Sequence, residues 1–267
     1  MLGPMHGISN VDPGRAIDWS RTSADYARHR PGPPEEFFRR LAALGIGLPG
    51  QRVLDLATGT GLLARQFARQ GSVVAGIDIA AGQIEAARRL AAEEGLAGRF
   101  EVAPAEATPF EAGSFDAATA NQCWLYFDPD RVLAELRRLL APGGLLATSH
   151  FSWLARTSPI ARASEALVLE FNPAWRGGDW AGTVPPVPDW AAARGLNLRA
   201  MFWFDAPIRF TAESWRGRMR ACRGVGATLD DAAVAAFDAA HVELLERIAP
   251  PEFDIVHRID AHLFGIA

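Results

Sequence analysis

Between residues 52 and 150, short apolar runs alternate with longer segments of helical periodicity. The longer segments carry apolar residues three or four positions apart and end close to a glycine. Strands and helices that alternate in this way fold into a parallel sheet with helices on both faces, and ligands bind beyond the carboxyl ends of its strands. We therefore expect a doubly wound α/β fold. The expected strands are 52–56, 72–78, 99–103, 115–120 and 145–150, and the expected helices are 58–71, 80–95 and 128–144.

The flanking segments are less regular. Residues 22–45 predict a helix that is interrupted by prolines. A stretch rich in Trp, Gly and Pro at residues 171–190 predicts an irregular loop, which we expect to cover the ligand site. The other expected elements are helices over 158–171, 210–224 and 229–248, and strands over 198–206 and 253–267.

Composition argues against several classes of function. A formal net charge of −4 over 267 residues does not suit general nucleic-acid binding. All 27 basic residues are arginine, because the sequence contains no lysine, and this excludes Schiff-base chemistry and a P-loop. Cys123 and Cys222 have neither disulfide-framework nor zinc-site spacing. Residues 1–15 lack a secretion signal, and no apolar run approaches about 18 residues, so we expect a cytoplasmic protein without a membrane partner.

The most informative motif is VLDLATGTG at residues 53–61, where a strand leads through a glycine turn into a helix. Gly59 and Gly61 allow the backbone to approach a ligand closely. The segment GTGLLA also fits the G-x-G-x-x-A fingerprint, so the glycines alone do not separate NAD from S-adenosylmethionine (SAM). Asp55 at the strand end would repel a pyrophosphate and attract the sulfonium and ammonium groups of SAM. Alternatively, Asp55 only caps the next helix.

A second carboxylate, Asp78, closes the next expected strand. From this position a carboxylate accepts hydrogen bonds from both ribose hydroxyls of a bound nucleoside. Asp78 therefore supports nucleoside binding in either cofactor class. The alternative is an aspartate in a solvated turn.

Four segments in order, VLDLATGTG, GIDIA, APAEATPFEAGSFDAATA and LRRLLAPGGLL, resemble those of the class I SAM-dependent methyltransferases. The resemblance covers residues 35–150 and is looser beyond them. Within it, AEATPF and NQCWLYFD are similar to the trans-aconitate and related small-molecule methyltransferases.

The resemblance implies a Rossmann-like sheet of seven strands, mostly parallel with an antiparallel last strand, and a helical cap insertion. It divides a single domain into an N-terminal helical lid (1–45), a SAM-binding core (46–150), and an acceptor-binding cap with the last two strands (151–267). The implied reaction moves the methyl group of SAM to an O, N or C atom of a small-molecule acceptor and releases S-adenosylhomocysteine (SAH). No metal is implied, and the expected protein is a monomer or homodimer.

The resemblance also implies which residues bind SAM. The backbone from Ala57 to Gly59 would hold the methionine end, and the lid would add Tyr26 and Arg30. Three departures from the family pattern are Ala57 in place of a glycine, Pro104 in place of an adenine-binding aspartate for which Glu106 could substitute, and Leu125 in place of a histidine. The implied cofactor-binding set is Tyr26, Arg30, Asp55, Ala57, Thr58, Gly59, Gly61, Asp78, Ile79, Gln83, Ala105, Glu106, Asn121 and Gln122.

Methyl transfer from a sulfonium needs alignment and desolvation, and a base only when the acceptor carries a proton. His150 is the candidate base, because it ends an expected core strand. The alternative is a histidine bonded to its own loop. Arg216, Arg220 and Arg223 share a helical face, which fits an acidic acceptor or a solvated surface. Many tryptophans after residue 150 fit an aromatic acceptor pocket or ordinary core.

Two other functions fit the same cofactor motif. One is an NAD-dependent oxidoreductase, which Asp55 argues against. The other is a SAM-binding protein without catalysis, which the sequence leaves open because the displacement requires no particular residue type.

Overall fold

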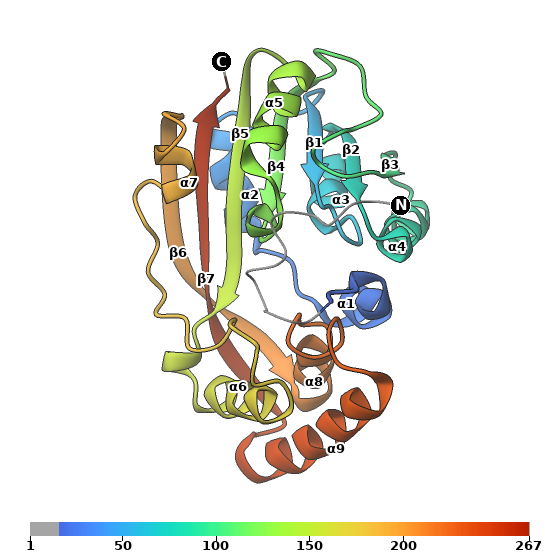
Figure 1. Cartoon of the computed structure of the whole chain (residues 1–267), viewed down its shortest axis with the longest axis vertical. Coiled ribbons are helices and arrows are strands. Elements are labelled where there is room, and N and C mark those ends of the chain that lie inside the picture. Colours follow the sequence, from blue (N-terminus) through green and yellow to red (C-terminus); the bar gives the residue numbers. More distant parts are fainter. Residues whose placement is uncertain (1–15, 267) are drawn as a thin grey trace.

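The computed structural model describes residues 16–266. Its centre is one seven-stranded sheet of order β3-β2-β1-β4-β5-β7-β6 (Figure 1). β7 is antiparallel to β5 and β6, and the other neighbouring strands pair in parallel. The predicted Rossmann-like sheet with an antiparallel last strand is therefore confirmed. The strands are β1 (Arg52–Leu56), β2 (Val73–Asp78), β3 (Arg99–Val102), β4 (Phe115–Asn121), β5 (Leu140–Trp153), β6 (Asn197–Thr211) and β7 (Glu252–Gly265).

Helices cover both faces of the sheet, as a doubly wound fold requires. One face is covered by α2 (Glu35–Ala43), α3 (Leu62–Arg69) and α4 (Ala81–Glu93). These helices bury their apolar side chains against the strands, among them Phe38, Phe67 and Ile84. On the other face, α5 (Pro129–Leu139) and α7 (Asp189–Ala192) form a second core. Strand order reverses between β1 and β4, so the ends of these two strands open the crevice in which such folds bind ligands.

The predicted helix over 128–144 is shorter than expected. Asp128 caps it by accepting hydrogen bonds from the backbone of Asp130 and Arg131, but the helix ends at Leu139 and β5 begins at Leu140. Pro142 explains the difference, because it has no N–H to donate and disfavours helical backbone in the residue before it.

The last three strands are much longer than the others. β6 has 15 residues and β7 has 14, and they run together from the sheet into a second, helical half of the molecule (Figure 1). There α6 (Pro159–Phe171), α8 (Ala212–Arg220) and α9 (Asp231–Ile248) pack on the strand ends around a separate core that includes Trp215 and Phe237. The expected cap thus comes from two insertions, one after β5 and one after β6.

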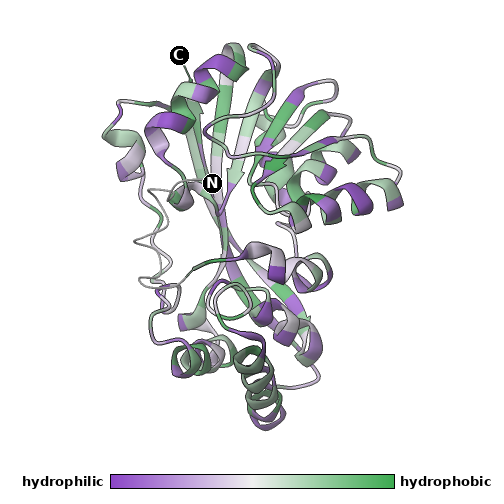
Figure 2. Cartoon of the chain, turned by 45° about the vertical axis from the view of Figure 1, so that its right-hand side comes forward, coloured by the Kyte–Doolittle hydropathy of each residue, from purple (hydrophilic) through white to green (hydrophobic). Residues whose placement is uncertain are grey.

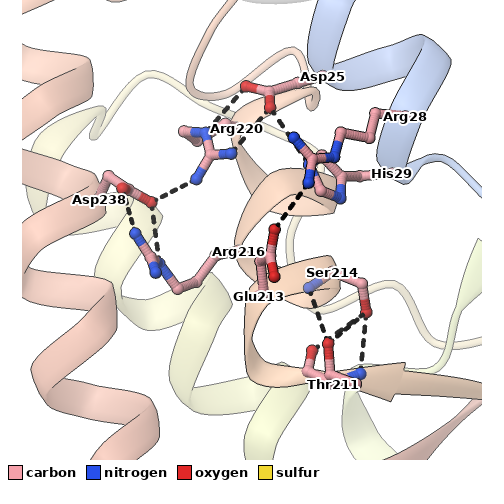
Figure 3. A network of polar contacts seen from close by, with 9 residues as sticks. All are labelled: Asp25, Arg28, His29, Thr211, Glu213, Ser214, Arg216, Arg220 and Asp238. Carbon is pink, nitrogen blue, oxygen red and sulfur yellow. Dashed lines mark hydrogen bonds and ion pairs between the residues drawn. The ribbon is translucent and has the colours of Figure 1, made fainter.

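The N-terminal segment lies between the sheet and this cap (Figure 1). It consists of η2 (Trp19–Thr22) and α1 (Ser23–His29), and α1 packs against α8. The guanidinium of Arg220 binds Asp25 of α1 and Asp238 of α9, and Arg216 also binds Asp238 (Figure 3). Residues 1–15 of the predicted lid, on which the expectation of no secretion signal rested, lie outside the described residues.

The expected loop over 171–190 is largely confirmed. Residues 172–188 form no helix or strand, and α7 begins at Asp189. Among residues 16–266, no helix is long and apolar enough to cross a membrane. Figure 2 shows mostly apolar strands in the sheet half, with polar segments on the outer helices.

Candidate functional site

A cavity of about 780 Å³ lies between the carboxyl ends of the strands and the cap. Its volume is in the upper part of the range for small-molecule sites. Twelve of the predicted site residues contribute to its wall, so residues from the lid, the core strands and β5 meet at one place. They are Tyr26, Arg30, Ala57, Gly59, Asp78, Ile79, Gln83, Ala105, Glu106, Asn121, Gln122 and His150.

The turn after β1 holds the carboxylate of Asp78 in place. Ala57 and Gly59 have φ of 48° and 58°, so the backbone turns sharply and the N–H of Gly59 donates to Asp78 Oδ2 at 3.0 Å. Asp78 Oδ1 accepts from the N–H of Ala80 at 2.9 Å. Burial raises the pKa of Asp78, although these two hydrogen bonds oppose the rise. The result is a fixed acceptor at the end of β2, where the sequence predicts a ribose contact.

Asp55 lies deeper than Asp78. Its two carboxylate oxygens accept hydrogen bonds from the hydroxyls of Thr58 and Thr119, each at 2.7 Å. Burial raises the pKa of Asp55 to about 6, so the carboxylate is mostly ionised at neutral pH. Asp55 and Thr58 line a second cavity of about 20 Å³, which has room for about one water molecule. The predicted contact of Asp55 with the cofactor stays a prediction.

Three side chains shape the end of the cavity beside Asp78. Ile79 is 46% exposed, and this apolar surface faces the cavity. Glu106 lines the same wall and accepts a hydrogen bond from the N–H of Asp128 at 3.1 Å. Gln83 donates to the carbonyl of Trp19 at 3.1 Å, while its buried Oε1 has no partner among the described residues.

Gly61 has a packing role, and its predicted contact with the cofactor stays a prediction. A Cβ at this position would lie 3.1 Å from Ala87 and 3.2 Å from Phe100, so Gly61 lets α3 pack closely against α4 and β3. It lines neither the main cavity nor the small one. The glycine is needed for packing and for its φ of 75° at the N-cap of α3.

The N-terminal segment contributes a cation to the cavity. The Arg30 guanidinium lies 4.7 Å from the ring centroid of Tyr26. Both residues line the main cavity and also the small cavity beside Asp55 and Ala57. Arg30 therefore lies beside the glycine turn, where a ligand carboxylate could bind it.

His150 is half exposed in the cavity and is paired with a residue that sequence reasoning missed. β5 and β7 place His150 directly opposite Asp260, and His150 Nδ1 lies 3.0 Å from Asp260 Oδ1. Because a carboxylate only accepts, Nδ1 carries the proton and Nε2 is the basic nitrogen. Asp260 is 2% exposed. The signal in the sequence was the alternation of Asp260 and His262 with apolar residues along the closing strand.

His262 belongs to the same wall. It is the cross-strand neighbour of Thr148, and its Nε2 donates to the carbonyl of Pro185 at 2.7 Å. This bond ties the 172–188 loop to β7. His257, five residues earlier, packs on the other face of the strand against Phe151, as the strand period predicts. Within residues 16–266, no three His, Cys, Asp or Glu side chains form a group that could hold a metal ion.

The arginines in and just after α8 do not share one environment, as the prediction had assumed. Arg216 and Arg220 form ion pairs inside the molecule, so they neither face an acceptor nor form a solvated surface. Arg223 lines the cavity and donates to the hydroxyl of Tyr126. The missed residue is Arg218, which also lines the cavity and stacks on Trp153 with 4.6 Å between the guanidinium carbon and the ring centroid. No spacing rule singled it out, because it lies off the Arg216–Arg220 face.

The comparisons with known proteins agree with this site. A family model described as a methyltransferase domain matches residues 54–148. A demethylmenaquinone methyltransferase of Thermus thermophilus is 43% identical over 116 residues, which are 42% of this chain and 53% of that protein. The chain thus spans about half the length of the first curated relatives it matches.

Two further matches extend over most of the chain. A ubiquinone biosynthesis O-methyltransferase of Methylocella silvestris is 30% identical over 186 residues, covering 69% of this chain and 70% of that protein. A candidate type II methyltransferase from Anaeromyxobacter dehalogenans has the same fold, with a TM-score of 0.61 at 22% identity over 88% of this chain and 96% of the other. Together with the cavity at the strand ends, these matches show that the chain belongs to the class I SAM-dependent methyltransferases.

Proposed function

We propose that this protein transfers the methyl group of SAM to a proton-bearing oxygen or carbon atom of a small-molecule acceptor, with His150 as the base. The observation that supports this most is that one cavity joins two chemically different ends. At one end are Asp78 and the glycine turn, and at the other is the His150–Asp260 pair. Such an arrangement would allow a nucleoside and a second molecule to bind side by side.

The residues of the cofactor end suit SAM. Asp78 would accept from the ribose hydroxyls with its remaining lone pairs, and the exposed side chain of Ile79 would cover one face of adenine. Arg30 would bind the carboxylate of the methionine portion. Asp55, ionised and bordering the one-water cavity, would attract the ammonium and sulfonium groups. A pyrophosphate would meet two carboxylates here, and this counts against NAD.

The acceptor end supplies a base. SAM brings an electrophilic methyl group on a sulfonium, a good leaving group. As the acceptor atom forms its bond to the methyl carbon, the carbon–sulfur bond breaks and its electron pair stays on sulfur, leaving neutral SAH. His150 Nε2 takes the acceptor proton, and Asp260 stabilises the resulting imidazolium through the Nδ1–H bond. A buried carboxylate beside the histidine would not be needed for alignment alone.

The names of the relatives support a small-molecule acceptor, since one is a demethylmenaquinone methyltransferase and another is an O-methyltransferase of ubiquinone biosynthesis. The family assignment gives no support to an NAD-dependent oxidoreductase. The His150–Asp260 pair counts against a SAM-binding protein without catalysis, because such a protein would not require the pair.

The test is an SAH-release assay with SAM and a panel of phenols, enols and carbon acids, run with the O-methylated or fully C-methylated analogues as negative controls. We expect SAH release with at least one proton-bearing acceptor and none with its methylated analogue. Calorimetry should show SAH binding and no NADH binding. NADH binding at the SAM site, or SAH binding without turnover across the panel, would contradict the proposal.

A further inference from the structure

A buried cation without a partner lies in the cap wall of the cavity. Arg218 is 3% exposed, and its Nη1 is buried without a hydrogen-bond partner. Among residues 16–266, no carboxylate forms an ion pair with it. Burial, and secondarily the charge of Arg30, lower the pKa of Arg218 to about 9, so the guanidinium stays charged at neutral pH.

The side chain is nevertheless held in one orientation. The guanidinium of Arg218 stacks on the indole of Trp153, which follows His150 on β5. Trp153 Nε1 donates to Glu165 Oε1 at 2.6 Å, and Glu165 Oε2 accepts from the N–H of Asp179 at 2.7 Å. Glu165 thus fixes the indole and the 172–188 loop together. The stacked guanidinium is part of the cavity wall.

The stacking does not offset the cost of burying the charge. A cation–π contact contributes about 2 kcal/mol when desolvated, whereas an uncompensated buried charge costs several kcal/mol. The other arginines of α8 have the acidic partner that a buried charge usually has. Arg216 binds Asp238, and Arg220 binds Asp25. Arg218 lines the cavity, so its missing partner would be a ligand.

Its position favours the acceptor over the cofactor. Arg30 borders both the main cavity and the small cavity beside Asp55 and Ala57, so it lies next to the glycine turn. Arg218 lines the main cavity but not the small one, and it stacks on Trp153, three residues after His150 on β5. The charge of Arg30 reaches Arg218, so the two arginines lie near each other, but only Arg30 also borders the small cavity at the glycine turn.

The surrounding charges and surfaces limit the kind of anion. Asp78, Glu106 and Asp260 also line the cavity, so a doubly charged phosphate would be repelled more strongly than a carboxylate. Arg218 lies against Trp153, and Trp175 and Trp180 also line the cavity. A planar apolar body fits such walls, and its carboxylate would reach the guanidinium.

We infer that the acceptor is a small aromatic carboxylic acid whose carboxylate is bound by Arg218 over Trp153 while its reactive atom faces His150. This inference rests on the proposed function, because it assigns the second molecule of the methyl-transfer reaction. Arg218 is then a specificity-determining residue, and Glu165 is a positioning residue that holds the indole.

The test is calorimetry on protein saturated with SAH, using three acid and amide pairs: benzoate and benzamide, 4-hydroxybenzoate and its amide, and 2-naphthoate and its amide. In the unsubstituted protein we expect at least one acid to bind about tenfold more tightly than its amide, since a hydrogen bond to a charged group is lost. In Arg218→Met this preference should disappear, while SAH affinity stays within about twofold. Arg218→Lys should keep part of the preference.

Arg216→Met is the matched control, being the same substitution on the same helix outside the cavity, and it should retain the full preference. Equal binding of acids and amides by the unsubstituted protein would overturn the inference, as would a preference that survives in Arg218→Met. Loss of SAH affinity in Arg218→Met would instead assign Arg218 to the cofactor. Failure of the unsubstituted protein to bind SAH would contradict the proposed function itself. If Arg218→Met does not fold, a full preference in Arg218→Lys would overturn the inference.

Discussion

The two ends of the cavity are built in different ways. The proposed cofactor end combines turns that follow β1, β2 and β4 within residues 53–122 with Tyr26 and Arg30 of the N-terminal segment, and its carboxylates are fixed by backbone and hydroxyl groups. The acceptor end joins β5, β7, α8 and the 172–188 loop, and its polar groups are a histidine–aspartate pair and an unpartnered arginine. In the proposed function, turns between neighbouring strands would position the cofactor, while long-range strand register would position the base.

The largest effect should come from the acceptor end. His150→Gln keeps a donor toward Asp260 but removes the base, so kcat should fall by about 100- to 10,000-fold. SAH affinity should change by less than about twofold, because the cofactor end is untouched. Steady-state kinetics and calorimetry on the same preparations measure both.

A pH series sharpens this result. In His150→Gln the deficit should shrink above the pKa of the acceptor itself, since an ionised acceptor needs no base. Asp260→Asn should also lower kcat, but by less than His150→Gln does. A His150→Gln enzyme with unchanged kcat would show that alignment alone performs the reaction.

The next effect concerns Asp55 at the cofactor end. Its pKa is about 6 in the folded protein and near the ordinary 3.8 in the unfolded chain. The folded state therefore binds more protons between pH 4 and 6, and the contribution of Asp55 to stability falls as pH rises through this window. Asp55→Asn should raise the free energy of unfolding above pH 6 on the order of 2 kcal/mol, with no gain below pH 4.

The same variant should bind SAM more weakly, because the anion that attracts the sulfonium is lost. Urea denaturation at pH 4, 6 and 8 with SAM titrations separates the two effects. A variant that is less stable at pH 8 would mean that the Thr58 and Thr119 bonds, rather than the buried charge, dominate.

A smaller effect should come from the contacts between the N-terminal segment and the cap. Arg220→Met breaks the contacts that hold α1 to α8 and α9 (Figure 3). We expect a loss of about 1 to 3 kcal/mol in unfolding free energy and a few-fold weaker SAH binding, because Tyr26 and Arg30 are carried by this segment. Arg209→Met, which removes exposed pairs on β6, is the control. Unchanged SAH affinity in Arg220→Met would separate the lid from cofactor binding.

Much of the cofactor end could be predicted from the sequence because its signals are local. Asp55 accepts from Thr58 three positions later, and Asp78 accepts from the N–H of Ala80 two positions later. Each carboxylate also has a partner farther away in the sequence, Thr119 for Asp55 and Gly59 for Asp78. Gly61 was the exception, since the same glycine that would suit a ligand suits helix packing equally well. Pro142 likewise ended a helix earlier than its periodicity indicated.

The acceptor end could be predicted only in part, because its pairs are far apart in the chain. His150 was found from its place at the end of a strand, but its partner Asp260 lies 110 residues later and is set by antiparallel register. Arg218 was missed because periodicity favoured Arg216 and Arg220, which two distant aspartates neutralise. Spacing identifies a helix face, whereas only the tertiary fold shows which charge is left without a partner.

The division between the two ends is tested most directly by SAH calorimetry on two variants side by side. Asp78→Ala removes the acceptor at the end of β2 and should weaken SAH binding by about 1 to 3 kcal/mol, or roughly 5- to 150-fold. Arg218→Met should leave SAH binding nearly unchanged. Unaltered affinity in Asp78→Ala together with a large loss in Arg218→Met would contradict the account, because the cofactor would then bind at the end assigned to the acceptor.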